Sequence, residues 1–146
     1  MTVRILADTN VVICAIDPRT PEKRARCRAW LSALRKTGSV TISLQVLHEG
    51  HAALRRKLRL PPEQAARLLA GWASLCDAPL TVAETERALQ IEQRYKVSWW
   101  DAVLMASAIG AECTHLLSED MQSAPLIDGL RILNPFETAP EDVLGG

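Results

Sequence analysis

Short apolar runs alternate with longer stretches of helical periodicity from one end of the chain to the other. The apolar, partly β-branched runs predict short strands at residues 3–6, 40–42, 80–82, 114–117 and 130–133. The spacing of apolar residues between them predicts a helical turn from Val11 towards Ile16, and helices over 22–36, from Ser43 to about Arg59, from Pro61 onwards, over 84–95 and over 99–109. Strands that alternate with helices are typical of an α/β fold, so we expect a three-layer sandwich with a central parallel sheet of four or five strands.

The length and composition of the chain are those of one folded domain. It has 146 residues, of which 48% are hydrophobic and 23% are charged. This balance excludes disordered and low-complexity classes, and the length allows a sizeable core. We expect a domain over residues 1–137 and a frayed tail over 138–146.

Two features predict a cytoplasmic protein that does not contact a membrane. The apolar stretch over residues 3–16 is broken by Arg4, Asp8 and Asn10, so it resembles neither a signal peptide nor a membrane span. The cysteines are spread along the chain without a CxxC pair, at Cys14, Cys27, Cys76 and Cys113. Such spacing predicts reduced thiols rather than disulfides or a zinc site.

Charge is distributed unevenly, although 17 basic residues balance 17 acidic ones. Residues 1–60 contain 12 Lys and Arg against 4 Asp and Glu, whereas residues 61–146 contain 5 against 13. The basic residues cluster at Arg19, Lys23, Arg24, Arg26 and Arg28, and again at Arg55, Arg56, Lys57 and Arg59. These clusters are either solvated helix faces or a rim that binds phosphates, and charge alone does not choose between the two.

Four acids occupy positions where chemistry is expected in a parallel α/β fold. Asp8 and Asp120 follow predicted strands, and ligands of such sheets bind beyond the carboxyl ends of the strands. Glu49 and Asp101 lie on predicted helices among apolar residues, where a carboxylate is costly unless it is paired, protonated or bound to a metal. Hard divalent ions prefer oxygen ligands, so a converging set of carboxylates suggests metal-assisted phosphoryl chemistry.

Each of these acids also has a purely structural interpretation. Asp8 can cap the following helical turn, and Asp101 completes the capping-box pattern Ser98-x-x-Asp101. Glu49 can be a solvated helix residue, and Asp120 a turn residue. Four such placements near one sheet edge favour a shared site over four separate structural roles.

These motifs, taken in order, resemble the PIN domain family, and more narrowly its VapC-type toxin ribonucleases. Ala7-Asp8-Thr9-Asn10 resembles the opening of such domains, and Ser43-x-x-Val46-x-x-Glu49 resembles their second motif. Val97-Ser98-Trp99-Trp100-Asp101-Ala102 resembles the third. The final region is similar over Leu116-Leu117-Ser118-Glu119-Asp120 and Leu130-Arg131-Ile132-Leu133-Asn134-Pro135-Phe136. The resemblance extends over nearly the whole chain.

The resemblance implies an active site and an activity. The acids that bind metal in the family correspond to Asp8, Glu49, Asp101 and Asp120. Supporting positions correspond to Thr9 and to Ser118, where Thr is commoner. Glu119 is an extra acid that we group with these supporting residues, and its role stays open. The implied reaction is cleavage of RNA by an endoribonuclease that uses Mg²⁺ or Mn²⁺, through one ion or two.

The same resemblance implies the toxin of a toxin–antitoxin pair, with RNA as substrate, a cognate antitoxin as partner and a homodimer as assembly. We expect the RNA to contact basic residues of the N-terminal half: Arg24, Arg28, Arg55, Arg56 and Lys57. Two alternatives remain open: a PIN nuclease that processes RNA without an antitoxin, and an inactive PIN module that only binds RNA or protein. Four intact acid positions favour an active enzyme.

Other interpretations fit the sequence less well. His48 and His51 are three residues apart, whereas the HExxH helix of zinc proteases needs a spacing of four. Haloacid-dehalogenase phosphatases need an Asp two residues after the first, where this chain has Asn10. A response-regulator receiver needs an acidic pair and a Lys that are missing, and no Gly-rich phosphate loop is present. The four tryptophans lie on predicted helices, so packing is favoured over base stacking.

Overall fold

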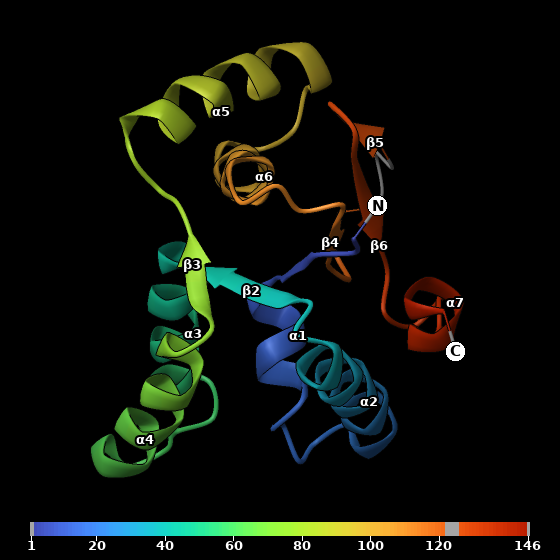
Figure 1. Cartoon of the computed structure of the whole chain (residues 1–146). Helices are drawn as coiled ribbons and strands as arrows, with labels where there is room; N and C mark the ends of the chain where they lie inside the picture. The colour runs from blue at the N-terminus through green and yellow to red at the C-terminus, as the bar shows by residue number, and fades with distance from the viewer. Residues whose placement is uncertain (1, 122–125, 146) are drawn as a thin grey trace.

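The computed structural model describes residues 2–121 and 126–145, and helices and short strands alternate through it (Figure 1). In chain order the elements are β1 (Ile5–Ala7), α1 (Thr9–Cys14), α2 (Pro21–Thr37), β2 (Val40–Ser43), α3 (Leu44–Arg56), α4 (Pro62–Ala73), β3 (Cys76–Ala78), α5 (Val82–Tyr95), α6 (Trp99–Gly110), β4 (His115–Leu117), β5 (Leu126–Ile127), β6 (Leu130–Leu133) and α7 (Pro140–Leu144). The order confirms the α/β class.

The described strands form one six-stranded sheet in the order β3-β2-β1-β4-β6-β5. Five of them are parallel, and only β5 runs antiparallel to its neighbour β6. The central strand β1 pairs with β2 on one side and with β4 on the other. Because β1 and β4 are adjacent and parallel, their carboxyl ends lie at the same edge of the sheet.

Helices cover both faces of the sheet and complete three layers (Figure 1). Side chains of a strand alternate between faces, so neighbouring residues enter different cores. Leu6 and Leu116 belong to the core under α5 and α6, whereas Ile5 and Leu117 belong to the core under α1, α2 and α7. Burial on both faces explains why the strands are almost wholly apolar.

The α3–α4 hairpin packs beside β2 and β3 at one end of the sheet. Gly50 of α3 faces Trp72 of α4 so closely that a Cβ atom at Gly50 would lie 2.9 Å from the indole ring. Leu54 and Ala65 are fully buried in the same core. The hairpin is therefore held by a tight helix–helix contact directly after Glu49.

Two strands differ from the sequence prediction. The strand expected at 80–82 is wrong: β3 occupies Cys76–Ala78, and Thr81 instead caps α5 through a capping box with Glu84. Strand β5 was not expected, and it forms a hairpin with β6. The two residues that join them, Asp128 and Gly129, both have positive φ, as a tight hairpin turn requires.

The tail expected to be frayed contains α7, which packs on α2. The indole N–H of Trp30 donates to the carbonyls of Pro135 at 3.1 Å and Thr138 at 3.0 Å. Val143 and Leu144 contact the core under α2. Apolar contacts and a buried indole donor therefore order this segment. No helix in the described part of the chain is long and apolar enough to cross a membrane.

Candidate active site

A cleft of about 640 Å³ lies at the carboxyl ends of β1 and β4. All four acids predicted from the sequence line it, together with the adjacent Glu119: Asp8, Glu49, Asp101, Glu119 and Asp120. They come from the loop after β1, from α3, from the first turn of α6 and from the loop after β4. The fold therefore brings together acids that are far apart in the sequence.

Of the four predicted acids, Asp8 is the most buried, with 9% of its surface exposed. It caps α1 by accepting from the Thr9 amide at 2.6 Å, and it accepts from the Ser118 hydroxyl at 2.8 Å. Burial raises the pKa of Asp8 to about 6, because the nearby charges of Glu49 and Asp101 add to desolvation and outweigh these hydrogen bonds. The cap predicted for Asp8 is formed, and its carboxylate also belongs to the cleft.

Glu49 reaches the cleft from α3, whose amino end is capped by Ser43. Its carboxylate accepts from the Thr9 hydroxyl at 2.9 Å. Thr9 therefore bonds both acids, Asp8 through its amide and Glu49 through its hydroxyl. Glu49 is exposed, but the contact with Thr9 shows that it is not simply a solvated helix residue.

Asp101 lies in the first turn of α6, where Ser98 is the N-cap. The Ser98 hydroxyl accepts from the Asp101 amide at 3.2 Å, while the Asp101 side chain lines the cleft. Thr81 and Glu84 of α5 form both halves of a capping box, with the carboxylate returning to the cap. Unlike the Thr81 cap, which uses the Glu84 carboxylate, the Ser98 cap uses only the backbone amide of Asp101. The carboxylate of Asp101 is therefore available to the cleft.

The side chain of Asn10 joins the two central loops of the cleft. Its Nδ2 lies 3.3 Å from Asp8 Oδ2, 3.2 Å from Ser118 Oγ and 3.2 Å from Asp120 Oδ2, and its Oδ1 accepts from the Glu119 amide. The sequence analysis did not predict this role, although Asn10 is the last residue of the first motif. The amide reduces repulsion between the acids by donating to two of them.

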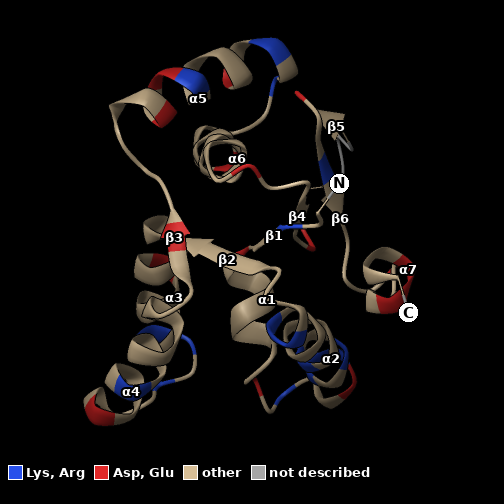
Figure 2. Cartoon of the chain, viewed as in Figure 1, with Lys and Arg blue, Asp and Glu red and all other residues tan. Residues whose placement is uncertain are grey.

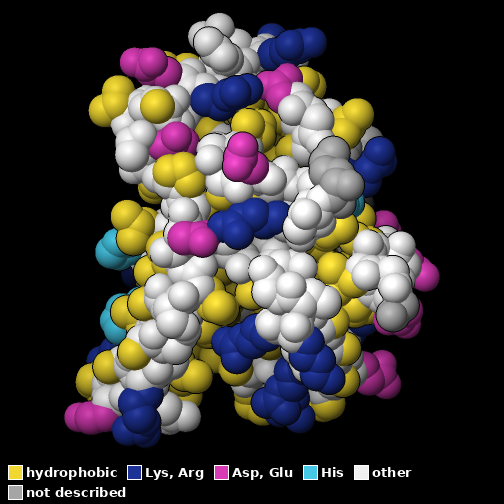
Figure 3. All heavy atoms as spheres, viewed as in Figure 1, with side chains coloured by type: hydrophobic (Ala, Val, Ile, Leu, Met, Phe, Trp, Pro, Cys, Tyr) yellow, Lys and Arg dark blue, Asp and Glu magenta, His cyan; other side chains and the backbone are white. Residues whose placement is uncertain are grey.

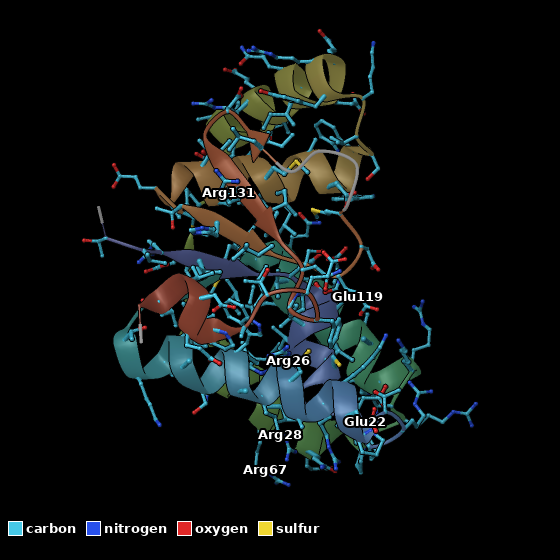
Figure 4. The ribbon with its side chains drawn as sticks, turned by 90° about the vertical axis from the view of Figure 1, so that its right-hand side faces the viewer. Glu22, Arg26, Arg28, Arg67, Glu119 and Arg131 are labelled. Carbon is cyan, nitrogen blue, oxygen red and sulfur yellow. The ribbon has the colours of Figure 1, made fainter. Side chains whose placement is uncertain are left out.

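Glu119 forms an ion pair with Lys23 of α2, at 2.9 Å. In Figure 4 the labelled Glu119 lies on the side of the sheet that faces the start of α2, where Glu22 is labelled. The pair links the loop after β4 to α2 across the cleft, and both residues line it. Lys23 was part of the basic cluster seen in the sequence, but it was not among the predicted RNA contacts.

The donors of the cleft suit a hard divalent cation. Carboxylate and hydroxyl oxygens of the kind that Mg²⁺ and Mn²⁺ prefer come from Asp8, Thr9, Glu49, Asp101 and Asp120. Among the residues that the structure describes, no three acids, histidines or cysteines have the spacing of a preformed metal site. The pKa of Asp8 is raised mainly by desolvation and to a smaller extent by the charges of Glu49 and Asp101, and a bound cation would favour its ionised form.

Only one of the five predicted RNA contacts, Lys57, lines the cleft itself. It also lines a second cavity of about 360 Å³, together with Arg28. Arg28 is partly engaged, because its Nε donates to the Ala15 carbonyl at 2.7 Å. Lys57 is therefore the predicted contact with the most direct access to the acids.

The other three basic residues lie outside both cavities. Arg55 donates to the Leu60 carbonyl at 2.7 Å and closes the turn between α3 and α4. Arg24 lies on α2, and Arg56 is exposed at the end of α3. Figure 2 marks basic residues along α2, Figure 3 shows blue basic side chains gathered over this region, and Arg26 and Arg28 are labelled on the helix in Figure 4.

Gln45 and Trp100 also line the cleft, and neither was among the predicted site residues. Gln45 is almost wholly buried at the start of α3, and nothing in the sequence distinguished it. Trp100 is 61% exposed, whereas Trp30 and Trp72 are buried as packing residues. Helix α6 is buried from Ala102 to Ala108, whereas its first turn, which contains Trp100, is not.

Comparison with known proteins agrees with this geometry. The PIN domain family model matches residues 5–124, while no curated protein matches at a significant level. One similar solved structure is a toxin–antitoxin complex from Klebsiella pneumoniae, with 21% identity, a TM-score of 0.66, and coverage of 90% of this chain and 97% of that chain. A second is DNA-bound VapBC from Salmonella typhimurium, with 18% identity, a TM-score of 0.66, and coverage of 92% of this chain and 99% of that chain. A third is VapC20 of Mycobacterium tuberculosis, described as a sarcin-ricin loop cleaving toxin, with 24% identity, a TM-score of 0.60, and coverage of 87% of this chain and 98% of that chain. At these identities the structures establish a common fold, and the chain belongs to the PIN domain family.

Proposed function

We propose that this protein is a metal-dependent endoribonuclease and the toxin of a toxin–antitoxin pair. The observation that carries the proposal is the cleft, in which acids from four separate segments converge at the carboxyl edge of a PIN-domain sheet. A module that only binds RNA or protein does not need four acids in one cleft. The raised pKa of Asp8, the buried acid, is also more typical of a catalytic site.

Four carboxylates are proposed to hold the cation: Asp8, Glu49, Asp101 and Asp120. A bound Mg²⁺ or Mn²⁺ would neutralise charge on the scissile phosphate and lower the pKa of an attacking water. Thr9 and Ser118 orient the carboxylates of Glu49 and Asp8 through their hydroxyl groups. Asn10 holds Asp8 and Asp120 together, in the way that outer hydrogen bonds orient metal ligands.

RNA is the proposed substrate, and the cationic side chains at the cleft are its proposed phosphate contacts. Lys23 and Lys57 line the cleft, and Arg28 lies in the neighbouring cavity that Lys57 also lines. Lysine side chains near the acids would hold the phosphates that flank the scissile one. The description of the mycobacterial neighbour as an RNA-loop-cleaving toxin supports the same substrate class.

A cognate antitoxin and a homodimer complete the proposal. Three of the similar structures are toxin–antitoxin complexes or VapBC pairs, which supports an antitoxin as partner. An antitoxin would inhibit by covering the acidic cleft. We place the protein in the cytoplasm, where RNA is available and thiols such as the free cysteines stay reduced.

The test is cleavage of a structured RNA by the purified protein with Mg²⁺, with Mn²⁺ and with a chelator. Asp8→Asn and Asp101→Asn should each abolish metal-dependent cleavage and leave the far-UV circular dichroism spectrum unchanged. Removal of a ligand should cost several kcal/mol of transition-state stabilisation, so more than about a tenth of the wild-type rate, about 1.4 kcal/mol, in either variant would contradict its assignment. The exposed acid Glu86 of α5 gives the control, because Glu86→Gln removes a carboxylate outside the cleft.

A further inference from the structure

Trp100 presents a large, exposed aromatic side chain to the cleft that contains the acids. It is 61% exposed, although it belongs to the first turn of a helix that is buried from Ala102 to Ala108. Its neighbour Asp101 is one of the acids, and Leu104, one helical turn further, lines the same cleft. The α6 side of the cleft therefore combines an exposed indole with a carboxylate at the next residue.

Gln45 fixes the position of this aromatic residue. Its Nε2 donates to the Trp100 carbonyl at 3.1 Å and ties the start of α6 to the start of α3. Gln45 is 8% exposed, and its Oε1 is buried without a hydrogen-bond partner among the described residues. The amide therefore satisfies its donor side through Trp100 and leaves its buried acceptor unpaired, which is unfavourable.

We propose that Trp100 stacks on the base of a nucleotide next to the scissile phosphate. This inference rests on the proposed ribonuclease function and deepens it. Every base has a π-face, so an exposed indole binds it without reading sequence. Bases in an A-form helix are stacked on each other, which leaves loops and single strands as the segments that can supply a free base face.

The surroundings of Trp100 favour RNA over a protein partner as its occupant. The indole shares one cleft with the acids that would face a phosphate through a cation and with the lysines Lys23 and Lys57. One nucleotide presents the matching groups, a charged phosphate and a flat apolar base, joined by a short sugar.

Binding of short oligonucleotides tests the proposal. Affinities of the wild type, Trp100→Ala and Trp100→Phe for single-stranded oligoadenylate are measured by fluorescence anisotropy, with Ca²⁺ in place of Mg²⁺. Loss of one stacked base should raise the Kd of Trp100→Ala about five- to 150-fold, the factor for ~1–3 kcal/mol. Trp100→Phe keeps a ring and should recover most of the affinity. Val82→Ala is the matched control, because Val82 is an exposed apolar residue in the first turn of α5 and lies outside the cleft.

An abasic oligomer of ribose phosphates separates stacking from other effects of the substitution. Wild type and Trp100→Ala should bind it equally, because it keeps the charge of the backbone and lacks the bases. An equal loss on both oligomers, or equal affinity of both proteins for oligoadenylate, overturns the proposal. A change of oligomeric state in Trp100→Ala without a change in oligonucleotide affinity would instead assign the indole to a protein interface.

The outcome is independent of whether the acids cleave RNA. If the ribonuclease proposal fails, the wild type leaves RNA intact with every metal, and its base-dependent binding is still measured. If only the stacking proposal fails, the wild type cleaves RNA, Asp101→Asn does not, and Trp100→Ala binds oligoadenylate as tightly as the wild type.

Discussion

Asn10 Nδ2 lies 3.2 Å from the Asp120 carboxylate, so an uncharged amide connects the loop after β1 to the loop after β4. The same amide approaches Asp8 and Ser118, and these contacts hold the acids in place without adding another charge. Asn10 is therefore a positioning residue, and it lies where a phosphatase of a different family would have its second aspartate.

Replacement of Asn10 by Ala should lower the affinity for Mn²⁺ and the rate of RNA cleavage by about 10- to 100-fold, the range seen when outer hydrogen bonds to metal ligands are removed. Titration of Mn²⁺ by calorimetry and a cleavage time course provide the two measurements. Gln90→Ala removes an exposed amide from α5 as a control. Wild-type Mn²⁺ affinity in Asn10→Ala would show that Asp8 and Asp120 need no help from Asn10.

Thermal melts distinguish the two roles of Asp101. Because the Ser98 cap uses the Asp101 amide, Asp101→Asn should keep the cap and relieve repulsion with Asp8. In a chelator the variant should melt at or above the wild-type temperature. Mn²⁺ should stabilise the wild type by about 2.7 kcal/mol at a hundredfold excess over Kd, and the variant much less. A variant that melts lower in chelator and gains fully from Mn²⁺ would leave Asp101 with a capping role only.

The stability of the metal-free protein should fall as the pH rises through the range in which Asp8 ionises. The ordinary pKa of Asp is 3.8 and that of Asp8 is about 6, so the folded protein holds a proton that the unfolded chain has already lost. Between these two values the free energy of unfolding should decrease by up to about 1.4 kcal/mol per pH unit, and above pH 6 the decrease should end.

Asp8→Asn lacks this titration, so its unfolding free energy relative to the wild type should rise between about pH 4 and 6 and then stay constant. Urea denaturation in a chelator at several pH values measures the difference. A constant difference across this range would mean that Asp8 has an ordinary pKa in the folded protein.

Salt dependence should identify Lys57 as the principal contact of its cluster. Lys57→Gln should reduce the slope of log Kd against log salt for single-stranded RNA by about 0.7, the value for one phosphate contact. Arg56→Gln should leave the slope unchanged, because Arg56 lies outside both cavities. Arg55→Gln should lower the melting temperature instead, since it removes the bond to the Leu60 carbonyl. If the slope of log Kd against log salt is the same for Lys57→Gln and the wild type, Arg55, Arg56 and Lys57 do not bind phosphates and form only a solvated helix face.

Two glycine substitutions should have opposite effects on stability. Gly50→Ala should destabilise the fold by about 1–3 kcal/mol, because its new methyl group overlaps the Trp72 ring. Gly71→Ala on α4 meets open space and should stabilise by about 0.5–1 kcal/mol through helix propensity. Chemical denaturation of both variants provides the measurement. A stabilised Gly50→Ala would show that Trp72 can move away at little cost.

The sequence predicts the fold class and the buried strands because their apolar, β-branched runs are unambiguous. Strand β3 escapes prediction because it contains Asp77, a charged residue in its middle. Asp77 is accommodated by an ion pair with Arg4 and a hydrogen bond from Thr41, both distant in the sequence. The hairpin of β5 and β6, by contrast, has a local signal that was overlooked, the Asp128-Gly129 pair between apolar residues.

The acids of the cleft could be predicted because a carboxylate after a strand or on an apolar helix is unusual by itself. Their supporting residues could not, because amides such as Asn10 and Gln45 are equally common on any polar surface. The exposure of Trp100 likewise depends on where the first turn of α6 ends relative to the cleft, which periodicity does not determine.

The contact between Ser118 and Asp8 joins residues 110 positions apart, across the central strands β1 and β4. Neither strand can close the middle of the sheet until both have left the ribosome, so an incomplete nascent chain cannot assemble the cleft. For an enzyme proposed to attack RNA inside the cell that makes it, the order of synthesis delays toxicity until the chain is nearly finished. Truncated products that end before β4 should therefore not be toxic to the cell, whether or not antitoxin is present.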